Sequence, residues 1–563
     1  MLTVLLSWVI FTLVILCFGD LLVLFWNKLT GRKEKYRIVD TFWLGIVFIS
    51  LLICLLSLFI PLNVFVTFSF FLITLIYWII NRKRLLIVYH KIYCQLQKQH
   101  WGTKVILISV FILILLYSLI SAEGYDIGLY HLQVMEWSDM YRVVPGLGNL
   151  HGRFSFNSNA LLIYLLFYRP DYFLSTFTIN GLFLLIIAFW TIIYAAQLHK
   201  ITQTIALLGI LVAFFITYIS TITSTSTNLL VNILCVYLLL KYIFENKSFT
   251  KDYLIYFSLP LLCITLKLSS IFICLLALIL IYNIIQKKNY RILNVLLLLS
   301  FLIIAPWITR FIITSGYFIY PYPSIDIFNF DWKIPIESVI QEKESIYAWS
   351  RLADKSPEVV LSMPLNEWLP IWLSRLHKIE ILVYSLSSIS ILTMLLFIRN
   401  INKYKKYFLA WGIAYIGFFF GFLTVPNSTY TLGFITCAAF IPFILLKKTY
   451  IIIRIEKYKI LQSLAYLFFI IILLNILQHG VKGIIKNQED SDSYLSLLYK
   501  PQPVFKTNQT NINVKEYKIG KTIIYTPIDG DRCFDHCIPC TPYINNSLIM
   551  RGETLQNGFK IKK

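Results

Sequence analysis

One stretch of the chain, Ser121–Asn159, gathers most of the side chains whose types could do chemistry. It follows an apolar run and carries Asp126, His131, His151 and Arg153. Ionisable groups are costly at membrane depth, and where they occur they usually face a cavity. In GYDIGLYH, the aspartate and the first histidine fall within two turns if the segment is helical. We predict that Asp126 and His131 are catalytic and that His151 and Arg153 bind substrate.

The pattern inside this stretch predicts the element that positions these groups. Leu129, Leu132, Met135 and Met140 recur at intervals of three to five residues, with aromatic residues between them. Such a pattern is typical of an amphipathic helix that lies at a membrane interface. The following VVPGLGNLHGR contains Pro145 and three glycines, which predict that the helix ends there.

Two cations elsewhere lie beside apolar runs. Lys267 is the only charge in LPLLCITLKLSSIFICLL, and Arg310 follows FLIIAPWIT. Each has an ordinary explanation, a snorkelling lysine at a helix end and an arginine anchored at the interface. We expect both to face the outer side and to bind a phosphate. Aromatic residues follow in SGYFIYPYPSIDIFNFDW, where Tyr317 and Tyr320 are expected to line a groove for a lipid or sugar.

A carboxylate beside cations is what glycosyl transfer from a lipid phosphate needs. Asp126 would accept the proton of the acceptor hydroxyl as a general base. Lysine and arginine would balance the charge of the leaving phosphate. Glu123 and Glu136 are weaker candidates for the base. Asp126, His131 and Glu136 would also offer ligands to a divalent metal ion, but we expect no metal or other cofactor, and the remaining acids of both outer loops are expected to be solvated.

Composition places the chain in a membrane. Of its 563 residues, 58% are hydrophobic and 14% charged, against about 45–50% and about 25% in soluble domains. Apolar runs of roughly 20 residues recur and predict an all-α polytopic protein with about 14 transmembrane helices. The net charge of +22 gathers in alternate loops, as expected for cytoplasmic loops. Nucleic acid is therefore not expected as a partner.

The spans and loops divide the chain into three parts. Residues 1–103 hold three spans with basic cytoplasmic loops, and residues 104–478 form the main transmembrane module. The module has two outer loops, at 122–171 and 310–378. Residues 479–563 are expected to form a small outer cap, α/β or irregular, which puts both termini on the outer side. Two details stay open: the long apolar run is expected to split near its lysine, and Ala160–Phe167 is either re-entrant, interfacial or part of a broken span.

Three cysteines lie together in the tail, in DRCFDHCIPCTPY. Cys533, Cys537 and Cys540, with His536, leave one ligand short of a usual structural zinc set. An oxidising outer compartment favours a disulfide, with free thiols and a metal site as the alternatives. The preferred pair is Cys533–Cys540.

The chain resembles the GT-C class of membrane glycosyltransferases at the first outer loop, where an acid lies just beyond a span. The chain also resembles an uncharacterised bacterial family of large membrane proteins. This resemblance rests on five sequence segments: YDIGLYHLQ, VPGLGNLHGR, FNS, SGYFIYPYPSIDIFNFDWKIP and CTPY. These resemblances imply a GT-C-like fold in the bacterial inner membrane. They further imply a polyprenyl-phosphate-linked sugar donor and membrane lipid as partners, with Asp126 in the place of the catalytic acid.

Three functions are compatible with these residues. The first is transfer of a sugar from the lipid carrier to a glycan, lipid or protein of the cell envelope. The second is a polysaccharide polymerase or ligase, which would rely on arginine and histidine more than on a carboxylate base. The third is a lipid-linked glycan transporter or flippase, which often has internal repeats and sites at mid-membrane. The absence of a clear repeat in the sequence and the polar groups at one face favour the first.

Overall fold

The structure, a computed structural model, describes residues 1–120, 124–169, 177–198, 200–245, 252–445, 455–488 and 512–562. Within these ranges the chain is mostly helical, and ten helices are long and apolar enough to cross a membrane. They are α1 (Leu2–Thr30), α2 (Ile38–Leu56), α8 (Ile179–Gln197), α9 (Ile201–Tyr218), α12 (Leu275–Gln286, extended by a 3₁₀ segment from Leu268), α13 (Tyr290–Ser315), α17 (Lys378–Leu395), α18 (Lys405–Thr424), α19 (Ser428–Leu445) and α20 (Ile455–Gln488). The chain is therefore a multi-pass membrane protein, because only about 20 such residues are needed to span the hydrocarbon core.

Four further segments that were expected to span the membrane are helical, but each helix by itself is shorter than the ten helices above. Helix α3 (Val64–Ile80) is followed by α4 (Arg82–Gln97) with a bend of 88° between them. Helices α5 (Trp101–Tyr117), α10 (Asn228–Phe244) and α11 (Tyr253–Leu266) are apolar but shorter. Ten spans are thus supported in the described ranges, and the count of about 14 stays a prediction.

Three boundaries differ from expectation. The basic stretch after α3 is the helix α4 rather than a loop. Helix α13 continues to Ser315 before Gly316 ends it in the left-handed region, so Arg310 lies inside this helix and not at the start of an outer loop. The region to residue 378 then forms α14 (Ile336–Arg351), α15 (Pro357–Ser362) and α16 (Leu365–Arg375). Helix α20 runs on to Gln488, beyond the expected start of the tail.

The short apolar run after the first outer loop is a buried helix. Helix α7 (Asn159–Phe167) has nine residues, and every one of them is buried in the protein. Nine residues extend only about 13 Å, so α7 does not cross a membrane by itself. The expected break in the long apolar run is present, because α11 ends at Leu266 and a 3₁₀ segment begins at Leu268.

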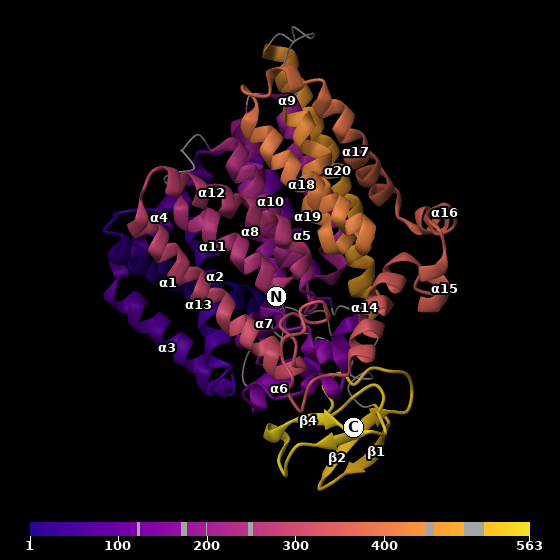
Figure 1. Cartoon of the computed structure of the whole chain (residues 1–563). Helices are drawn as coiled ribbons and strands as arrows, with labels where there is room; N and C mark the ends of the chain where they lie inside the picture. Colours follow the sequence, from indigo (N-terminus) through magenta and orange to yellow (C-terminus); the bar gives the residue numbers. More distant parts are fainter. Residues whose placement is uncertain are drawn as a thin grey trace.

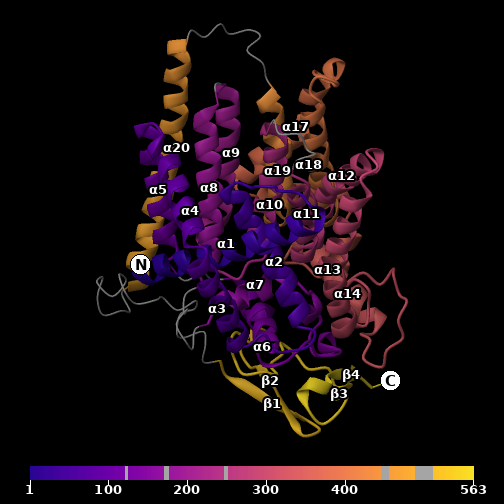
Figure 2. The same cartoon turned by 90° about the vertical axis from the view of Figure 1, so that its left-hand side faces the viewer.

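The C-terminal tail forms a small β-structured cap at one end of the helical bundle (Figures 1 and 2). Strands β1 (Val514–Ile519) and β2 (Thr522–Pro527) form one antiparallel pair, and β3 (Leu548–Met550) and β4 (Phe559–Ile561) form another. Both views place the cap beside α6 (Leu132–Met140). The cap therefore covers the end of the bundle that carries the loop with Asp126.

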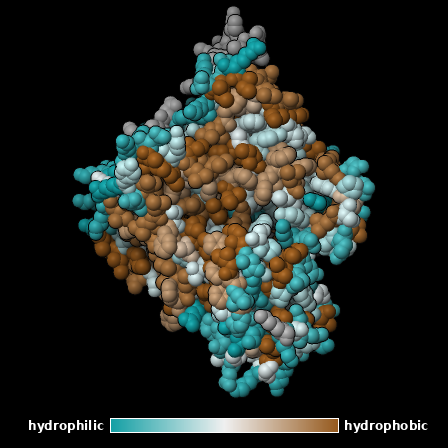
Figure 3. Space-filling view, in the orientation of Figure 1, coloured by the Kyte–Doolittle hydropathy of each residue, from teal (hydrophilic) through white to brown (hydrophobic). Residues whose placement is uncertain are grey.

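The surface divides into apolar and polar zones along the bundle. Figure 3 shows hydrophobic residues over the middle of the bundle and hydrophilic residues over the cap and toward the opposite end. An apolar belt between two polar ends is the arrangement expected of a protein that spans a bilayer. The segment that follows Asp126 contacts the cap at one of these polar ends, because Gly128 accepts from the backbone of Phe534.

Candidate functional site

The site is centred on an ion-paired carboxylate at the start of a helix. Asp126 precedes a π-helix, Ile127–His131, and keeps 41% of its side-chain surface exposed. The Nη1 atom of Arg153 donates to Asp126 Oδ1 at 3.1 Å, and its Nε atom donates to Glu342 Oε1 at 3.2 Å. Arg153 therefore joins two carboxylates, while Asp126 Oδ2 has no hydrogen-bond partner among the described residues.

Glu342 corrects the expectation that the acids of the second outer loop are solvated. It lies on α14, with only 12% of its side-chain surface exposed. Burial raises the pKa of Glu342, and the charge of Arg153 partly offsets that effect. The sequence carried one signal, because the apolar residue Val339 lies three residues earlier and so on the same helical face. In the structure Val339 is fully buried.

His131 lies behind the carboxylate and is neutral. Its ring shares a hydrogen bond of 2.9 Å between Nδ1 and Thr225 Oγ1. Burial lowers the pKa of His131 to about 4, and the charges of Asp126, Lys267 and Arg153 act on the same ring. These three charges are therefore within electrostatic range of His131, and the charge of Asp126 also acts on Lys267.

Lys267 is held where α11 ends, by two neighbours that the sequence did not single out. Its ammonium group donates to Asn228 Oδ1 and lies 3.3 Å from the centre of the Tyr430 ring. The asparagine and the tyrosine come from STITSTSTN and PNSTY, the polar turns that begin α10 and α19. Both turns carried a signal, since they are polar segments expected on the same side as Lys267.

A short segment within the first outer loop connects the end of α11, beside Lys267, with Arg310. Asn157 accepts from Arg310 Nε at 2.9 Å, and the next residue, Ser158, donates to the carbonyl of Leu266 at 2.7 Å. Arg310 also donates to Ser57 at 2.6 Å. Within the described residues neither cation pairs with a carboxylate. The structure places Arg310 across this segment from Lys267, with no contact to Asp126.

Two of the three remaining predicted binding residues lie near the ion pairs, because the Tyr320 hydroxyl and Glu342 Oε2 both lie beside Gly152, which follows His151. Tyr317 is buried and donates to the carbonyl of Ile334 at 3.0 Å, which holds it in a structural contact. Tyr320 is buried with its ring centre 6.1 Å from that of Phe156. His151 is buried against Phe154, with 5.0 Å between ring centres. The last two predicted residues therefore flank the ion pairs, whereas Tyr317 does not reach them.

The amphipathic pattern predicted that the helix after the π-helix lies exposed at a membrane interface. The structure corrects this prediction. Most of α6 is buried, because α7 packs on it and the cap covers it. Gln133 is fully buried and donates to the carbonyls of Phe534 and His536 at 3.2 and 2.7 Å. Gly128 accepts from the backbone of Phe534 at 2.8 Å, and a Cβ there would lie 2.6 Å from that ring. The cap thus packs directly on the segment that carries Asp126.

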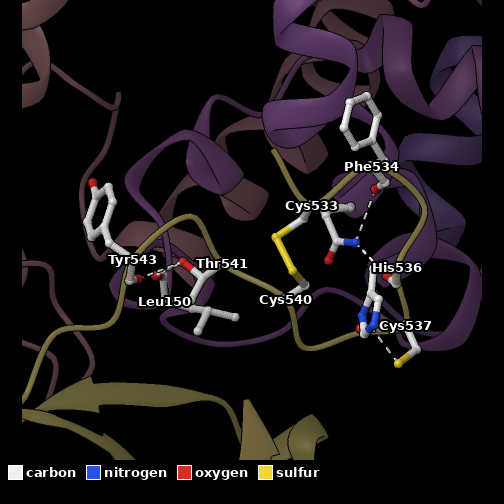
Figure 4. Close-up of a disulfide and its surroundings, with 9 residues drawn as sticks. Leu150, Cys533, Phe534, His536, Cys537, Cys540, Thr541 and Tyr543 are labelled. Atoms are coloured by element: carbon white, nitrogen blue, oxygen red, sulfur yellow. Dashed lines mark hydrogen bonds between the residues drawn. A yellow bond between two sulfur atoms is a disulfide. The ribbon is translucent and has the colours of Figure 1, made fainter. Parts of the chain in front are cut away.

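A disulfide closes the part of the cap that makes these contacts. Cys533 and Cys540 are joined, as the sequence favoured, and Cys537 is free and exposed. Figure 4 shows the disulfide between the segment that binds Gln133 and the segment that reaches Leu150. It therefore joins two points at which the cap contacts the loop.

Removing the disulfide is expected to loosen the cap without unfolding the bundle. Serine at both Cys533 and Cys540 should destabilise the closed segment by about 2 kcal/mol, because a short loop is released in the unfolded state. Limited proteolysis of the full chain should then cut the cap much faster, while helical circular dichroism stays unchanged. Cys537→Ser is the matched control and should match the unsubstituted protein; equal proteolysis of all three proteins would contradict this role.

The two buried histidines predict a pH dependence of stability. Burial lowers the pKa of His131 to about 4 and that of His151 to about 3, from an ordinary value of about 6.5. Between about pH 6.5 and pH 4, the unfolded chain binds protons at these histidines that the folded protein does not bind. The free energy of unfolding is therefore highest above about pH 6.5 and falls as the pH is lowered toward 4. The slope should reach about 3 kcal/mol per pH unit. Thermal unfolding in detergent should show it, with a shallower slope in His151→Gln and an unchanged one in the exposed His90→Gln.

The metal alternative finds no support in the geometry of the donor groups. Among the described residues, no group of three or more His, Cys, Asp and Glu side chains is placed to hold a metal ion. Asp126, His131 and Glu136 do not form such a group, nor do the tail cysteines with His536. Glu123 and Asp171 lie outside the described residues.

Comparison with known proteins places the chain in a family but assigns no activity. The family model described as a domain of unknown function, DUF8201, matches residues 1–436. The chain belongs to this family. No curated protein and no solved structure matches it. The matched range includes Asp126, Arg153, Lys267, Arg310 and Glu342, whereas the cap lies beyond it.

Proposed function

We propose that this protein is a membrane glycosyltransferase that moves a sugar from a polyprenyl-phosphate carrier to a cell-envelope acceptor. The observation that carries the proposal is a partly exposed carboxylate, Asp126, within electrostatic range of Lys267, a cation that lacks a carboxylate partner in the described ranges. Asp126 and Lys267 both act on His131, and Asn157–Ser158 joins Lys267 to Arg310. Charges removed from water need a counter-charge, and a lipid phosphate would supply it.

The proposed reaction is an inverting displacement at the anomeric carbon of the donor. Asp126 Oδ2 takes the proton of the acceptor hydroxyl as its oxygen attacks that carbon. The bond between the anomeric carbon and the phosphate oxygen breaks, and polyprenyl phosphate leaves with the electron pair. Lys267 and Arg310 balance the charge on the leaving phosphate. Arg153 holds Asp126 through Oδ1 and leaves the other oxygen free to act.

Two further observations support transfer over the alternatives. A polymerase or ligase would rely on arginine and histidine more than on a carboxylate, and Arg153 is already paired with Asp126 and Glu342. A transporter would be expected to bind its substrate near mid-membrane. The segment that follows Asp126 instead contacts the cap, through the bond from the Phe534 backbone to Gly128, and the cap lies at one end of the bundle (Figure 1). In this proposal the fold is GT-C-like with about 14 spans. The cap and both termini lie on the outer side of the inner membrane.

The direct test uses the host's own lipids as the donor pool, because the sugar is not specified. The full chain in nanodiscs is incubated with a lipid extract of host cells that lack the protein, together with their membranes as acceptor. Polyprenyl phosphate should be released and one sugar-lipid consumed. An unchanged lipid profile would contradict the proposal.

A further inference from the structure

Three buried polar atoms beside the ion pairs lack a hydrogen-bond partner. Both ring nitrogens of His151 and the hydroxyl of Tyr320 have none among the described residues, and these side chains are 4% and 1% exposed. A buried polar group without a partner costs roughly 1–3 kcal/mol. Three such atoms on neighbouring elements are therefore costly unless something else completes their hydrogen bonds.

The atoms lie around one small region. Gly152 follows His151, and a Cβ at this glycine would lie 2.7 Å from the Tyr320 hydroxyl and 3.3 Å from Glu342 Oε2. The ring centre of His151 lies 5.7 Å from that of Tyr543, which comes from the cap. The first outer loop, the segment after α13, helix α14 and the cap thus all reach this region.

Tyr543, the cap residue beside His151, is held in place by the disulfide and by Thr541. Thr541 follows Cys540 and donates to the carbonyl of Leu150 at 2.9 Å, next to His151 (Figure 4). Its backbone also donates to Tyr525 at 3.0 Å, on β2. Tyr543 is 62% exposed, so it forms a solvent-facing wall beside two buried polar groups.

The polar groups that lack partners are uncharged, which indicates the class of ligand. Burial, reinforced by the charge of Arg153, lowers the pKa of His151 to about 3 and keeps the ring uncharged. Burial also raises the pKa of Tyr320 well above its ordinary value. Glu342 is already paired with Arg153. Neutral groups that both donate and accept suit hydroxyl groups, whereas a phosphate would need free cations.

We propose that His151, Tyr320 and Tyr543 form a subsite for a neutral sugar ring, completed by the C-terminal cap. The proposal rests on the proposed function and extends it, because it names the class of group that is held beside Asp126. Sugar hydroxyls would pair with the His151 nitrogens and the Tyr320 hydroxyl. The apolar face of the ring would pack on Tyr543, since aromatic rings offer rigid apolar surface.

Saturation-transfer NMR on the full chain in nanodiscs tests the subsite with defined probes. The probes are the α- and β-methyl glycosides of glucose, galactose, mannose and arabinose, which lack the phosphate. At least one glycoside should receive saturation. His151→Ala and Tyr543→Ala should each reduce that signal about fivefold, the effect of losing about 1 kcal/mol, whereas Tyr543→Phe should retain it.

Tyr517→Ala is the matched control, because this tyrosine lies on β1 of the same cap, in register with Ile524 of β2. It should leave the signal unchanged. Absence of saturation for every glycoside, or equal signals in all variants, would show that the unpaired atoms bind water only and would overturn the subsite. The subsite and the function can fail separately. Glycoside binding with an unchanged sugar-lipid profile in the nanodisc assay would remove the function alone, whereas sugar transfer without glycoside binding would remove the subsite alone.

Discussion

Replacing Asp126 with asparagine is expected to slow sugar transfer at least about 100-fold, the lower end of what a general base contributes. Asparagine has the same shape and can still accept from Arg153 through its carbonyl oxygen, so the ion-paired neighbourhood should survive. The proton of the acceptor hydroxyl would then have no base. The rate of polyprenyl phosphate release by the purified variant measures the effect.

Asp354→Asn is the matched control for this change. Asp354 is an exposed acid of the second outer region, where it pairs with Arg375 at 2.6 Å. It should insert and react like the unsubstituted protein. Thermal unfolding of both variants separates loss of chemistry from loss of fold. Activity of Asp126→Asn within about twofold of the control would remove the carboxylate from the reaction.

Lys267→Met is expected to raise the donor concentration needed for half-maximal rate by about 10- to 100-fold. A hydrogen bond to a charged group is worth about 1.5–3 kcal/mol, and methionine cannot pair with the donor phosphate. The requirement for acceptor should change little, because Asp126 and Arg153 remain. Methionine fills a similar volume and removes a charge from a half-buried position, so the protein should stay folded.

The control for Lys267 lies at the other end of the same apolar segment. Lys287 is exposed just after α12, and Lys287→Met should leave both concentration dependences unchanged. Measuring the transfer rate of both variants against donor concentration shows whether Lys267 binds the donor. Equal donor requirements would mean that Lys267 only positions Asn228 and Tyr430.

The residues of the site could be predicted where a charge interrupts an apolar run. Lys267 was visible in this way, whereas Asp126 and Arg153 were visible because they lie in the polar stretch that follows an apolar run. In the structure the charges of all three are within electrostatic range of His131. Glu342 could not be selected among the other acids of its region. Its partner, Arg153, lies 189 residues earlier in the chain, and a contact of that sequence separation is set by helix packing rather than by a local pattern.

The elements were predictable as apolar segments, but their ends and their burial were not. Hydropathy located the ten long helices and the break beside Lys267, because both are local properties of composition. It did not indicate that α13 includes Arg310, nor that α6 is buried. Burial of α6 comes from the cap, through the bonds between Gln133 and the segment at Phe534, which lies some 400 residues away in sequence.

The most direct test of the central claim is mass spectrometry of envelope glycans and sugar-lipids from host cells. Three strains are compared: one lacking the protein, one restored with the unsubstituted chain, and one restored with Asp126→Asn. The account predicts that the first and third lack the same sugar from an envelope molecule and accumulate the same polyprenyl-phosphate-linked sugar. Identical glycans in all three strains, with Asp126→Asn present in the membrane, would contradict it.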